Sequence, residues 1–219
     1  MRVLHRDGMV LAVDKPAGAL SVPGRDGEAA ISTEARALGA LPVHRLDRGT
    51  SGVLLFALGA DAHRALNAAF ESRRAEKVYL ALVQGELREN TTCTLGLARA
   101  RGGSMRVDPS GLAARTDFAP LERFPGFTWV EARPRTGRTH QVRVHLAALG
   151  HPLAVDERYG QPGPLRIEGA LLERTPLHAA SIRVPHPSGR GWLAVESPLP
   201  DDLGACLDAL RAARRRAGR

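Results

Sequence analysis

Short apolar runs separated by turn residues constrain the fold of this chain more than any other feature of its sequence. Runs of this kind lie at residues 53–58, 78–83 and 177–184, and each has the length of a strand rather than of a helix. Near the N-terminus, Asp7-Gly8 is a hairpin signal between two further runs. Because strand-like runs outnumber helical segments and are mostly joined by hairpins, we predict an α+β fold. Its sheet is mixed and mostly antiparallel, unlike that of a doubly wound βαβ fold.

Four segments have the composition and apolar spacing of helices. They lie at residues 29–38, 61–73, 139–150 and 203–216. No linker rich in Gly or Ser divides the chain, and its 219 residues fit one domain. We therefore predict one domain over residues 1–200, with a C-terminal helix and basic tail at 201–219 packed on it or trailing from it.

The chain is strongly basic. Lys and Arg number 31 against 23 Asp and Glu, which gives a formal net charge of +8. Residues 201–219 hold five Arg and three Asp and contribute only +2, which leaves +6 for the rest of the chain. A basic globular body favours a polyanionic partner such as nucleic acid. Phe, Trp and Tyr make up only 4% of the residues, so a module that binds single strands by base stacking alone is not favoured.

The N-terminus and the two cysteines bear on the compartment. His5, Arg6 and Asp7 stand where a signal peptide needs its apolar region. No run approaches the roughly 18 apolar residues of a membrane span. Cys93 and Cys206 form neither a disulfide framework nor the spacing of a zinc site. We therefore expect a cytoplasmic protein with no membrane partner.

One carboxylate stands out by its neighbours. Asp47 lies between Arg45 and Arg48, and two glycines and the buried-strand run 53–58 follow it directly. Acids flanked by arginines often form structural ion pairs. The alternative is a carboxylate that nearby cations keep ionised at the mouth of a strand, where it can take part in chemistry. The residues alone leave both interpretations open.

A second segment, residues 133–145, is rich in Arg and His and contains no acid. Its glycine-containing turn leads into the helix predicted at 139–150, with Thr139 as the N-cap. Such a turn suits phosphate contacts, because helix N-termini also bind anions; a solvated basic face is the alternative. Arg143 lies beside the core positions Val142 and Leu146, so we expect it to be partly buried and paired with a carboxylate.

Six motifs span about residues 9–199. They are Lys-Pro-Ala-Gly at 15–18, His-Arg-Leu-Asp at 44–47 with Thr-Ser-Gly-Val at 50–53, Tyr-Leu-Ala-Leu-Val-Gln-Gly at 79–85, Thr-Gly-Arg-Thr-His-Gln-Val-Arg-Val-His at 136–145, Gly-His-Pro at 150–152 and Leu-His-Ala at 177–179. In residues and in order these motifs resemble those of the RluA-type pseudouridine synthases. Any one of them is weak, but six in register make a chance match very improbable.

The resemblance implies a fold and a reaction. The fold is the pseudouridine-synthase catalytic fold, with a sheet in two halves flanked by helices and an active-site cleft across the sheet. The reaction breaks the N1–C1′ bond of a uridine in RNA, turns the base and joins C5 to C1′. Asp47 matches the catalytic aspartate, and Arg143 matches the basic residue that pairs with it. Tyr79 matches the active-site tyrosine, which is expected to contact the target base and to assist removal of the C5 proton.

The resemblance also implies residues that bind the substrate. Leu177 matches an apolar residue that lines the pocket, and Arg45 is expected to hold the flipped-out nucleotide. Arg135, Arg138 and His140 are expected to bind the RNA. One carboxylate suffices because the same base leaves and returns, so we expect no cofactor and no metal ion. Three routes stay open, in which the aspartate attacks C1′, attacks C6 or deprotonates C2′.

The implied partner is structured RNA, either 23S rRNA, tRNA or both. Larger family members begin with an S4-like RNA-binding domain, whereas this chain begins at the first catalytic hairpin, as compact members do. The stretch at residues 21–25 is similar to that of the compact member that modifies both 23S rRNA and the tRNA anticodon stem-loop. We expect the protein to be a monomer.

Two other functions are weighed against the isomerase. A catalytically silent RNA-binding relative would keep the basic surface but could lose Asp47, Tyr79 or Arg143, and all three are present. A hydrolase of N-glycosidic bonds would need a second acid, such as Asp156, and would release free uracil. The local sequence instead predicts Asp156 and Glu157 in a turn and on a solvated face.

Overall fold

The computed structural model describes residues 1–24 and 28–217, and the chain divides into two compact units. Unit 1 comprises Met1–Val78 and His178–Pro198, and unit 2 comprises Tyr79–Leu177 and Leu199–Arg219. Each unit has its own hydrophobic core. The stretch 21–25 and the basic tail lie partly outside the described residues. Over residues 1–24 and 28–217, no helix combines the length and apolarity that a membrane span requires.

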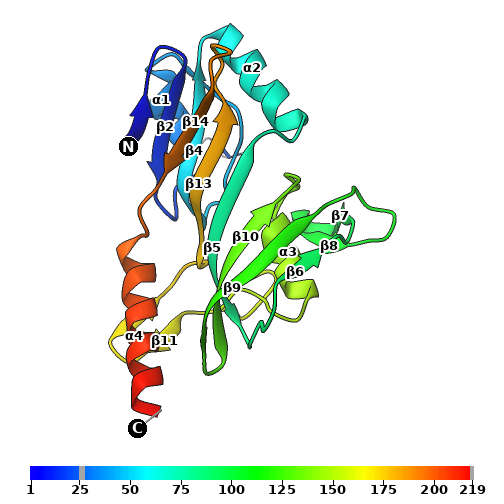
Figure 1. Ribbon diagram of the computed structural model, residues 1–219, viewed down its shortest axis with the longest axis vertical. Coiled ribbons are helices and arrows are strands. Elements are labelled where there is room, and N and C mark those ends of the chain that lie inside the picture. The colour runs from blue at the N-terminus through cyan, green and yellow to red at the C-terminus, as the bar shows by residue number, and fades with distance from the viewer. Residues whose placement is uncertain (25–27, 218–219) are drawn as a thin grey trace. The chain divides into compact units, whose positions relative to one another are not determined.

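Unit 1 is built from strands flanked by two helices (Figure 1). Its elements are β1 (Arg2–Arg6), β2 (Val10–Lys15), α1 (Ile31–Arg36), β3 (Ala40–Pro42), β4 (Ser51–Leu58), α2 (Ala60–Glu71), β13 (Leu177–Pro185, whose first residue belongs to unit 2) and β14 (Trp192–Glu196). The strand order is β1-β2-β4-β13, with β3 paired to β4 and β14 to β13. Only β4 and β13 run parallel among these pairs in the described residues. The sheet is therefore mixed and mostly antiparallel, as predicted.

The central strand β4 is buried along almost its whole length, which confirms the buried strand predicted at 53–58. Leu55 of β4 belongs to a core cluster that also holds Leu66 of α2. At the start of β4, Gly52 has a φ of 113°, and a Cβ atom there would overlap the backbone of Ala179 on β13. Only glycine lets the two parallel strands approach this closely.

Unit 2 holds the rest of the strands and two helices (Figure 1). Its elements are β5 (Glu76–Gln84, whose first residues belong to unit 1), β6 (Thr91–Cys93), β7 (Leu97–Arg99), the 3-10 helix η1 (Arg101–Gly103), β8 (Met105–Val107), β9 (Thr116–Phe124), β10 (Phe127–Pro134), α3 (Gln141–Ala148), β11 (Leu165–Ile167), β12 (Ala170–Leu172) and α4 (Asp201–Ala217). The strand order β5-β10-β9-β6 is antiparallel throughout. Two short hairpins, β7 with β8 and β11 with β12, stand apart from it.

The two faces of the β5-β10-β9-β6 sheet are covered by different helices. On one, which we call the inner face, Phe118 and Ala132 share a core cluster with Val142 of α3. On the other, the outer face, Trp129 shares a core cluster with Leu207 of α4. Helix and strands thus meet through apolar side chains at alternate strand positions, as the period of a β-strand requires.

All four predicted helices are present, each with its ends moved by a few residues. The N-cap predicted for the third was wrong. His140, not Thr139, occupies the N-cap of α3, and its backbone has a left-handed φ of 53°. The turn before α3 is closed from inside the helix instead, because the side-chain oxygen of Gln141 accepts the Arg138 N–H at 3.0 Å.

Candidate active site

Asp47 lies in the turn that leads into β4 of unit 1. The backbone of this turn is held by hydrogen bonds within the turn and to the loop after β2. The Thr50 N–H donates to the Asp47 carbonyl at 3.1 Å and closes the turn. The Arg48 carbonyl accepts the Gly18 N–H at 2.8 Å and the Lys15 ammonium at 3.2 Å. Asp47 itself is partly buried. The turn therefore carries its carboxylate on a fixed backbone.

Ser21 holds the residue before Asp47 by two reciprocal hydrogen bonds. Its hydroxyl oxygen accepts the Leu46 N–H at 2.9 Å, and the hydroxyl donates to the Leu46 carbonyl at 2.8 Å. Ser21 and Leu46 are only 4% and 5% exposed, so water does not replace these bonds. Nothing in the local sequence marks Ser21 for this role, since its partner lies 25 residues away in the chain.

Lys15 joins the loop after β2 to the same turn. Its side chain is completely buried, and its ammonium donates to the carbonyls of Pro16, Ala19 and Arg48 at 2.9, 2.8 and 3.2 Å. Burying an ammonium is costly unless its donors are satisfied. The lysine of the motif at 15–18 therefore has a structural role, because it links that loop to the turn of Asp47.

His44, the first residue of the His-Arg-Leu-Asp motif at 44–47, anchors that motif to β4 and α2. Its Nε2 accepts the Leu55 N–H at 2.9 Å, which places the ring proton on Nδ1. The ring stacks on Phe70, with centroids 5.1 Å apart. Burial, together with the positive charge of nearby Lys77, lowers the pKa of His44 to about 3. His44 is thus a neutral anchor at physiological pH.

Arg143 of α3 is the buried cation of unit 2. It is 8% exposed, and its Nε and Nη2 donate to the two carboxylate oxygens of Asp156 at 2.7 and 2.8 Å. Its guanidinium also lies over the Tyr159 ring, 5.0 Å from the centroid. The expectation that Arg143 is buried and bound to a carboxylate is confirmed. The pairing of Arg143 with Asp47 of unit 1 stays a prediction.

Asp156 was expected on a solvated turn, and that expectation was wrong. It is only 1% exposed, whereas Glu157 is exposed. Besides Arg143, its carboxylate accepts the N–H groups of Arg158 and Tyr159 at 3.0 and 3.3 Å. Burial opposes ionisation of Asp156, but the bond to Arg143 and its charge outweigh burial and lower the pKa of this carboxyl group. Asp156 is therefore the fixed counter-charge of Arg143.

Tyr159 connects the start of α3 to the pair of Arg143 and Asp156. Its hydroxyl oxygen accepts the Met105 N–H at 2.8 Å and lies 2.7 Å from Nδ1 of His140. His140 was predicted to bind substrate, and the structure places it beside the ring on which Arg143 stacks. Tyr159 was not singled out as a site residue. The only signal for it was that it is one of two tyrosines in the chain.

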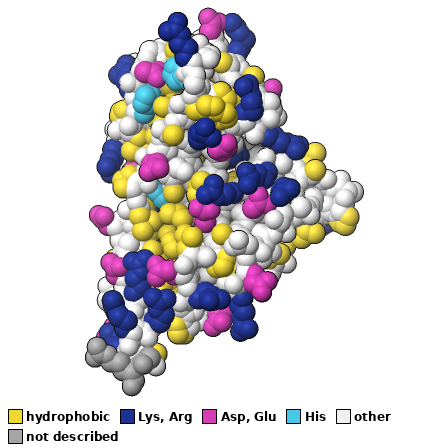
Figure 2. All heavy atoms as spheres, viewed as in Figure 1, with side chains coloured by type: hydrophobic (Ala, Val, Ile, Leu, Met, Phe, Trp, Pro, Cys, Tyr) yellow, Lys and Arg dark blue, Asp and Glu magenta, His cyan; other side chains and the backbone are white. Residues whose placement is uncertain are grey.

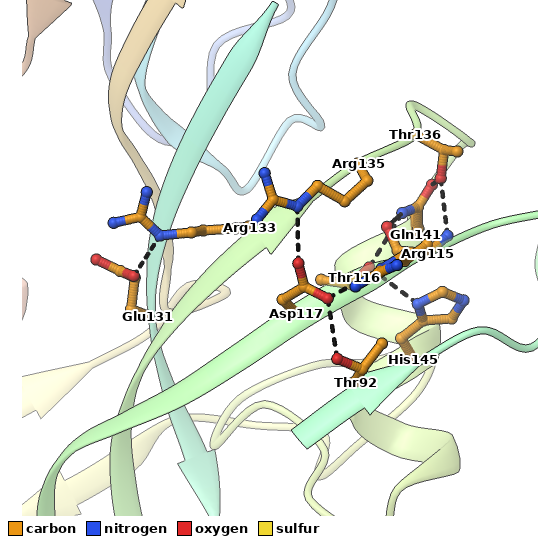
Figure 3. A network of polar contacts seen from close by, with 10 residues as sticks. All are labelled: Thr92, Arg115, Thr116, Asp117, Glu131, Arg133, Arg135, Thr136, Gln141 and His145. Atoms are coloured by element: carbon orange, nitrogen blue, oxygen red, sulfur yellow. Dashed lines mark hydrogen bonds and ion pairs between the residues drawn. The ribbon is translucent and has the colours of Figure 1, made fainter. Parts of the chain in front are cut away.

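A buried polar network fixes the turn at residues 135–140 (Figure 3). The side-chain oxygen of Gln141 accepts the Thr136 hydroxyl at 2.7 Å, in addition to the Arg138 N–H. The amide nitrogen of Gln141 donates to the Arg115 carbonyl at 2.9 Å and to the Thr116 hydroxyl at 3.0 Å. Every hydrogen-bonding atom of the Gln141 side chain is thus used, which makes the turn rigid.

The eight predicted site residues are divided between the units. Arg45 and Asp47 lie in unit 1, and Tyr79, Arg135, Arg138, His140, Arg143 and Leu177 lie in unit 2. Within unit 2, Tyr79 packs against the inner-face cluster that contains Leu177, which is 3% exposed. Arg135 instead projects on the outer face, where it binds Asp117. Arg45 is exposed.

Over the part of the chain that the structure describes, no group of three or more His, Cys, Asp or Glu side chains could hold a metal ion. Unit 1 thus offers a carboxylate on an anchored backbone, and unit 2 offers a buried guanidinium and a tyrosine.

Comparisons with known proteins place the chain in a family. A family model described as RNA pseudouridylate synthase matches residues 9–148. "Ribosomal large subunit pseudouridine synthase C" of Vibrio parahaemolyticus is 38% identical over 96% of this chain and 70% of its own length. "Ribosomal large subunit pseudouridine synthase D" of Nitrosomonas europaea is 36% identical over 96% of this chain and 65% of its own length.

Solved structures agree with the sequence matches. "Human RNA Pseudouridylate Synthase Domain Containing 1" is 30% identical, with a TM-score of 0.75 over 98% of this chain and 94% of that one. "Human RNA Pseudouridylate Synthase Domain Containing 4" has a TM-score of 0.80 over 96% of this chain and 93% of that one; at 24% identity it shows the shared fold.

An α+β fold with these motifs defines an isomerase that acts on uridine in RNA. The chain belongs to the RNA pseudouridylate synthase family. The resemblance to the RluA-type enzymes is thereby confirmed, and so is the fold class that it implied.

Proposed function

We propose that this enzyme isomerises uridine in large-subunit ribosomal RNA and that Asp47 is its catalytic carboxylate. The RNA class is supported by two of the relatives, which are named ribosomal large subunit pseudouridine synthases. The role of Asp47 is supported by its match to the family's catalytic aspartate and by the anchoring of its turn. That anchoring is the observation that carries the proposal.

The anchoring suits each of the three open routes. Attack at C1′, attack at C6 and removal of the C2′ proton all use a carboxylate at a defined place relative to the nucleotide. Both peptide groups that flank Asp47 are hydrogen-bonded, because the Ser21 hydroxyl donates to the Leu46 carbonyl and the Thr50 N–H donates to the Asp47 carbonyl. The next carbonyl, that of Arg48, accepts from Lys15 and Gly18. The backbone that carries the carboxylate is therefore fixed by the fold before the RNA arrives, which leaves less ordering for the reaction step.

Arg143 and Tyr79 complete the proposed catalytic set. Arg143 is the cation assigned to Asp47, and its own orientation is set by Asp156 and Tyr159. Tyr79 contacts the target base and assists removal of the C5 proton. Leu177, in the same apolar cluster as Tyr79, lines the pocket for the base.

The target uridine leaves its stack to reach these groups. Arg45, which is exposed just before Asp47 in the chain, holds the flipped nucleotide. Arg138 and His140 lie in and after the rigid turn before α3, where backbone N–H groups and cations favour phosphate. Arg135 binds Asp117 on the outer face of the sheet, opposite Tyr79, so RNA that it contacts lies outside the pocket for the target nucleotide.

A hydrolase that uses Asp47 and Asp156 as paired acids is less well supported. Asp156 is almost completely buried and forms a two-bond pair with Arg143. A general acid must give up a proton to the leaving group, and the lowered pKa of Asp156 keeps it ionised instead.

The test is tritium release from C5-labelled uridine in transcribed 23S rRNA. Wild type is compared with Asp47→Asn and with Asp61→Asn, which changes an exposed acid on α2 in the same unit. We expect release by wild type and Asp61→Asn, at least a thousandfold less by Asp47→Asn, and unchanged RNA binding by all three. Turnover near the wild-type rate in Asp47→Asn overturns the role of Asp47. Free uracil among the products indicates the hydrolase, and release from tRNA alone overturns the ribosomal substrate.

A further inference from the structure

The outer face of the unit 2 sheet is polar at the end that α4 leaves open. Alternation along the strands places Arg115 and Asp117 of the β9 region and Arg133 and Arg135 of the β10 region on this face, while their neighbours are buried. The register puts Asp117 opposite Arg133 on one side and opposite Thr92 of β6 on the other. Asp117 and Arg133 stand on paired strands, and Arg115 and Arg135 lie one residue beyond the strand ends, where the Arg135 N–H still donates to the Arg115 carbonyl at 2.8 Å.

Two of these arginines share one carboxylate. Nε of Arg135 donates to one oxygen of Asp117 at 2.7 Å, and Nε of Arg115 donates to the other at 3.1 Å (Figure 3). The Thr92 hydroxyl donates to Asp117 as well, at 2.9 Å. The hydrogen bond from Arg135 is the main reason that the pKa of Asp117 is lowered. The carboxylate of Asp117 therefore holds two guanidinium groups in place, and the three side chains together keep a net positive charge.

The way these arginines are bound differs from that of the structural ion pairs in the same unit. Arg143 and Arg174 each use Nε and Nη2 together to hold both oxygens of Asp156 and Asp202. Arg115 and Arg135 use Nε alone, and within residues 1–24 and 28–217 their Nη atoms make no hydrogen bond. Their side chains are 56% and 54% exposed. The edge formed by the two Nη atoms thus stays available, and this edge binds a phosphate by two parallel hydrogen bonds.

Further charge surrounds the pair. Arg133 stands next to it on the outer face, with Nε bound to Glu131 at 2.6 Å. In Figure 2, Lys and Arg side chains gather with a few acids over the region where Figure 1 draws β9 and β10. The positive potential of this surface attracts a polyanion, and the guanidinium groups of Arg115 and Arg135 can bind its phosphates.

We propose that this outer-face patch, made of Arg115, Asp117 and Arg135, binds the phosphodiester backbone of an RNA segment other than the one that carries the target uridine. The proposal rests on the proposed function, because it requires an RNA substrate. Tyr79 packs on the inner face of the same sheet, and the patch lies on the opposite face. A nucleotide flipped toward Tyr79 therefore cannot also touch Arg115, and a second segment of a folded RNA has to reach the patch.

The test compares two RNAs and two double variants. The patch variant is Arg115→Gln with Arg135→Gln. The control variant, Arg88→Gln with Arg166→Gln, removes the same charge from exposed positions of unit 2 outside the patch. Binding is measured as a function of salt for full-length transcribed 23S rRNA and for the shortest stem-loop of it that wild type still modifies. Melting curves confirm that both variants fold.

We expect the patch variant to bind 23S rRNA several-fold more weakly and its salt slope to fall by about 2, one unit for each phosphate that the variant no longer binds. Its binding and turnover of the stem-loop should match those of wild type, and the control variant should match wild type on both RNAs. Equal losses on both RNAs, no loss on either, or an equal loss in the control variant overturns the proposal. Failure of wild type to modify either RNA is a failure of the proposed function instead, and is visible separately.

Discussion

Asp47 of unit 1 and Arg143 of unit 2 are positioned in different ways. In unit 1, the bonds that fix Asp47 reach its peptide groups and those of its neighbours, through Ser21, Lys15 and Thr50. In unit 2, the bonds that fix Arg143 reach the guanidinium itself, through Asp156. One side chain is carried on an anchored backbone, and the other is held by a partner of opposite charge.

This difference predicts how each region responds to change. A neutral hydrogen bond contributes about 1 kcal/mol to stability, so the anchors of Asp47 act as several small and separate increments. A buried ion pair acts as a unit, because loss of one partner leaves the other charge in a low-dielectric place at a cost of about 3–5 kcal/mol. A single substitution in the ion pair of unit 2 should therefore lower the free energy of unfolding strongly. A single substitution among the anchors of Asp47 should lower it only slightly.

The largest effect is expected for Asp156→Asn. The change removes the counter-charge of Arg143 in a site that is almost closed to water, and we expect the free energy of unfolding to fall by about 3–5 kcal/mol. Urea unfolding measures it. The control is Asp117→Asn, which changes a more exposed acid of unit 2 and should cost at most about 1 kcal/mol.

A double variant sharpens this result. Replacing both Arg143 and Asp156 by Met removes both charges together, so it should be more stable than Asp156→Asn alone. If Asp156→Asn unfolds within about 0.5 kcal/mol of wild type, the pair contributes no more than a surface salt bridge, and the contrast between the two regions is lost.

Much of this arrangement could be predicted from the sequence, because local patterns determined it. The continuous apolar run at 53–58 predicted the buried strand β4, and the spacing of Val142 and Leu146 predicted both α3 and the burial of Arg143. A buried arginine needs a carboxylate, and the structure supplies one. These inferences use residues a few positions apart, for which helix and strand periods are reliable guides.

The partners themselves could not be predicted in this way. Arg143 and Asp156 are 13 residues apart, and Ser21 and Leu46 are 25 apart. Locally, Asp156 has the composition of a solvated turn, and Ser21 that of a loop. Their burial results from chain segments that meet only in the folded protein, so no period or turn rule within either segment reports it.

The second effect concerns pH and tests the region of Asp47. His44 has a pKa of about 3 in the folded protein against 6.5 ordinarily, so between these values the folded state binds fewer protons than the unfolded state. Stability that depends on neutral His44 is therefore fully present above pH 6.5 and is lost as pH falls. We expect a loss of about 1–2 kcal/mol between pH 6.5 and 5 in urea unfolding.

The matched variant for this experiment is His44→Gln, which offers an oxygen to the Leu55 N–H but does not titrate in this range. It should flatten the pH dependence, whereas His63→Gln on α2 should leave it as in wild type. An equally steep pH dependence in His44→Gln would mean that other groups cause the acid sensitivity of this unit.

The smallest change in stability, and the sharpest test of the backbone anchoring, is expected for Ser21→Ala. The variant loses both bonds to Leu46 and should unfold about 1 kcal/mol more easily. Because Leu46 precedes Asp47, the carboxylate loses part of its fixed position, and kcat should fall several-fold while KM for the RNA is unchanged. The control is Ser72→Ala, which removes a hydroxyl that donates to the Ala68 carbonyl at 2.6 Å near the end of α2. It should leave kcat as in wild type. If Ser21→Ala and Ser72→Ala lose stability alike and neither changes kcat, then Ser21 supports only the fold, and the placement of Asp47 does not depend on its anchored backbone.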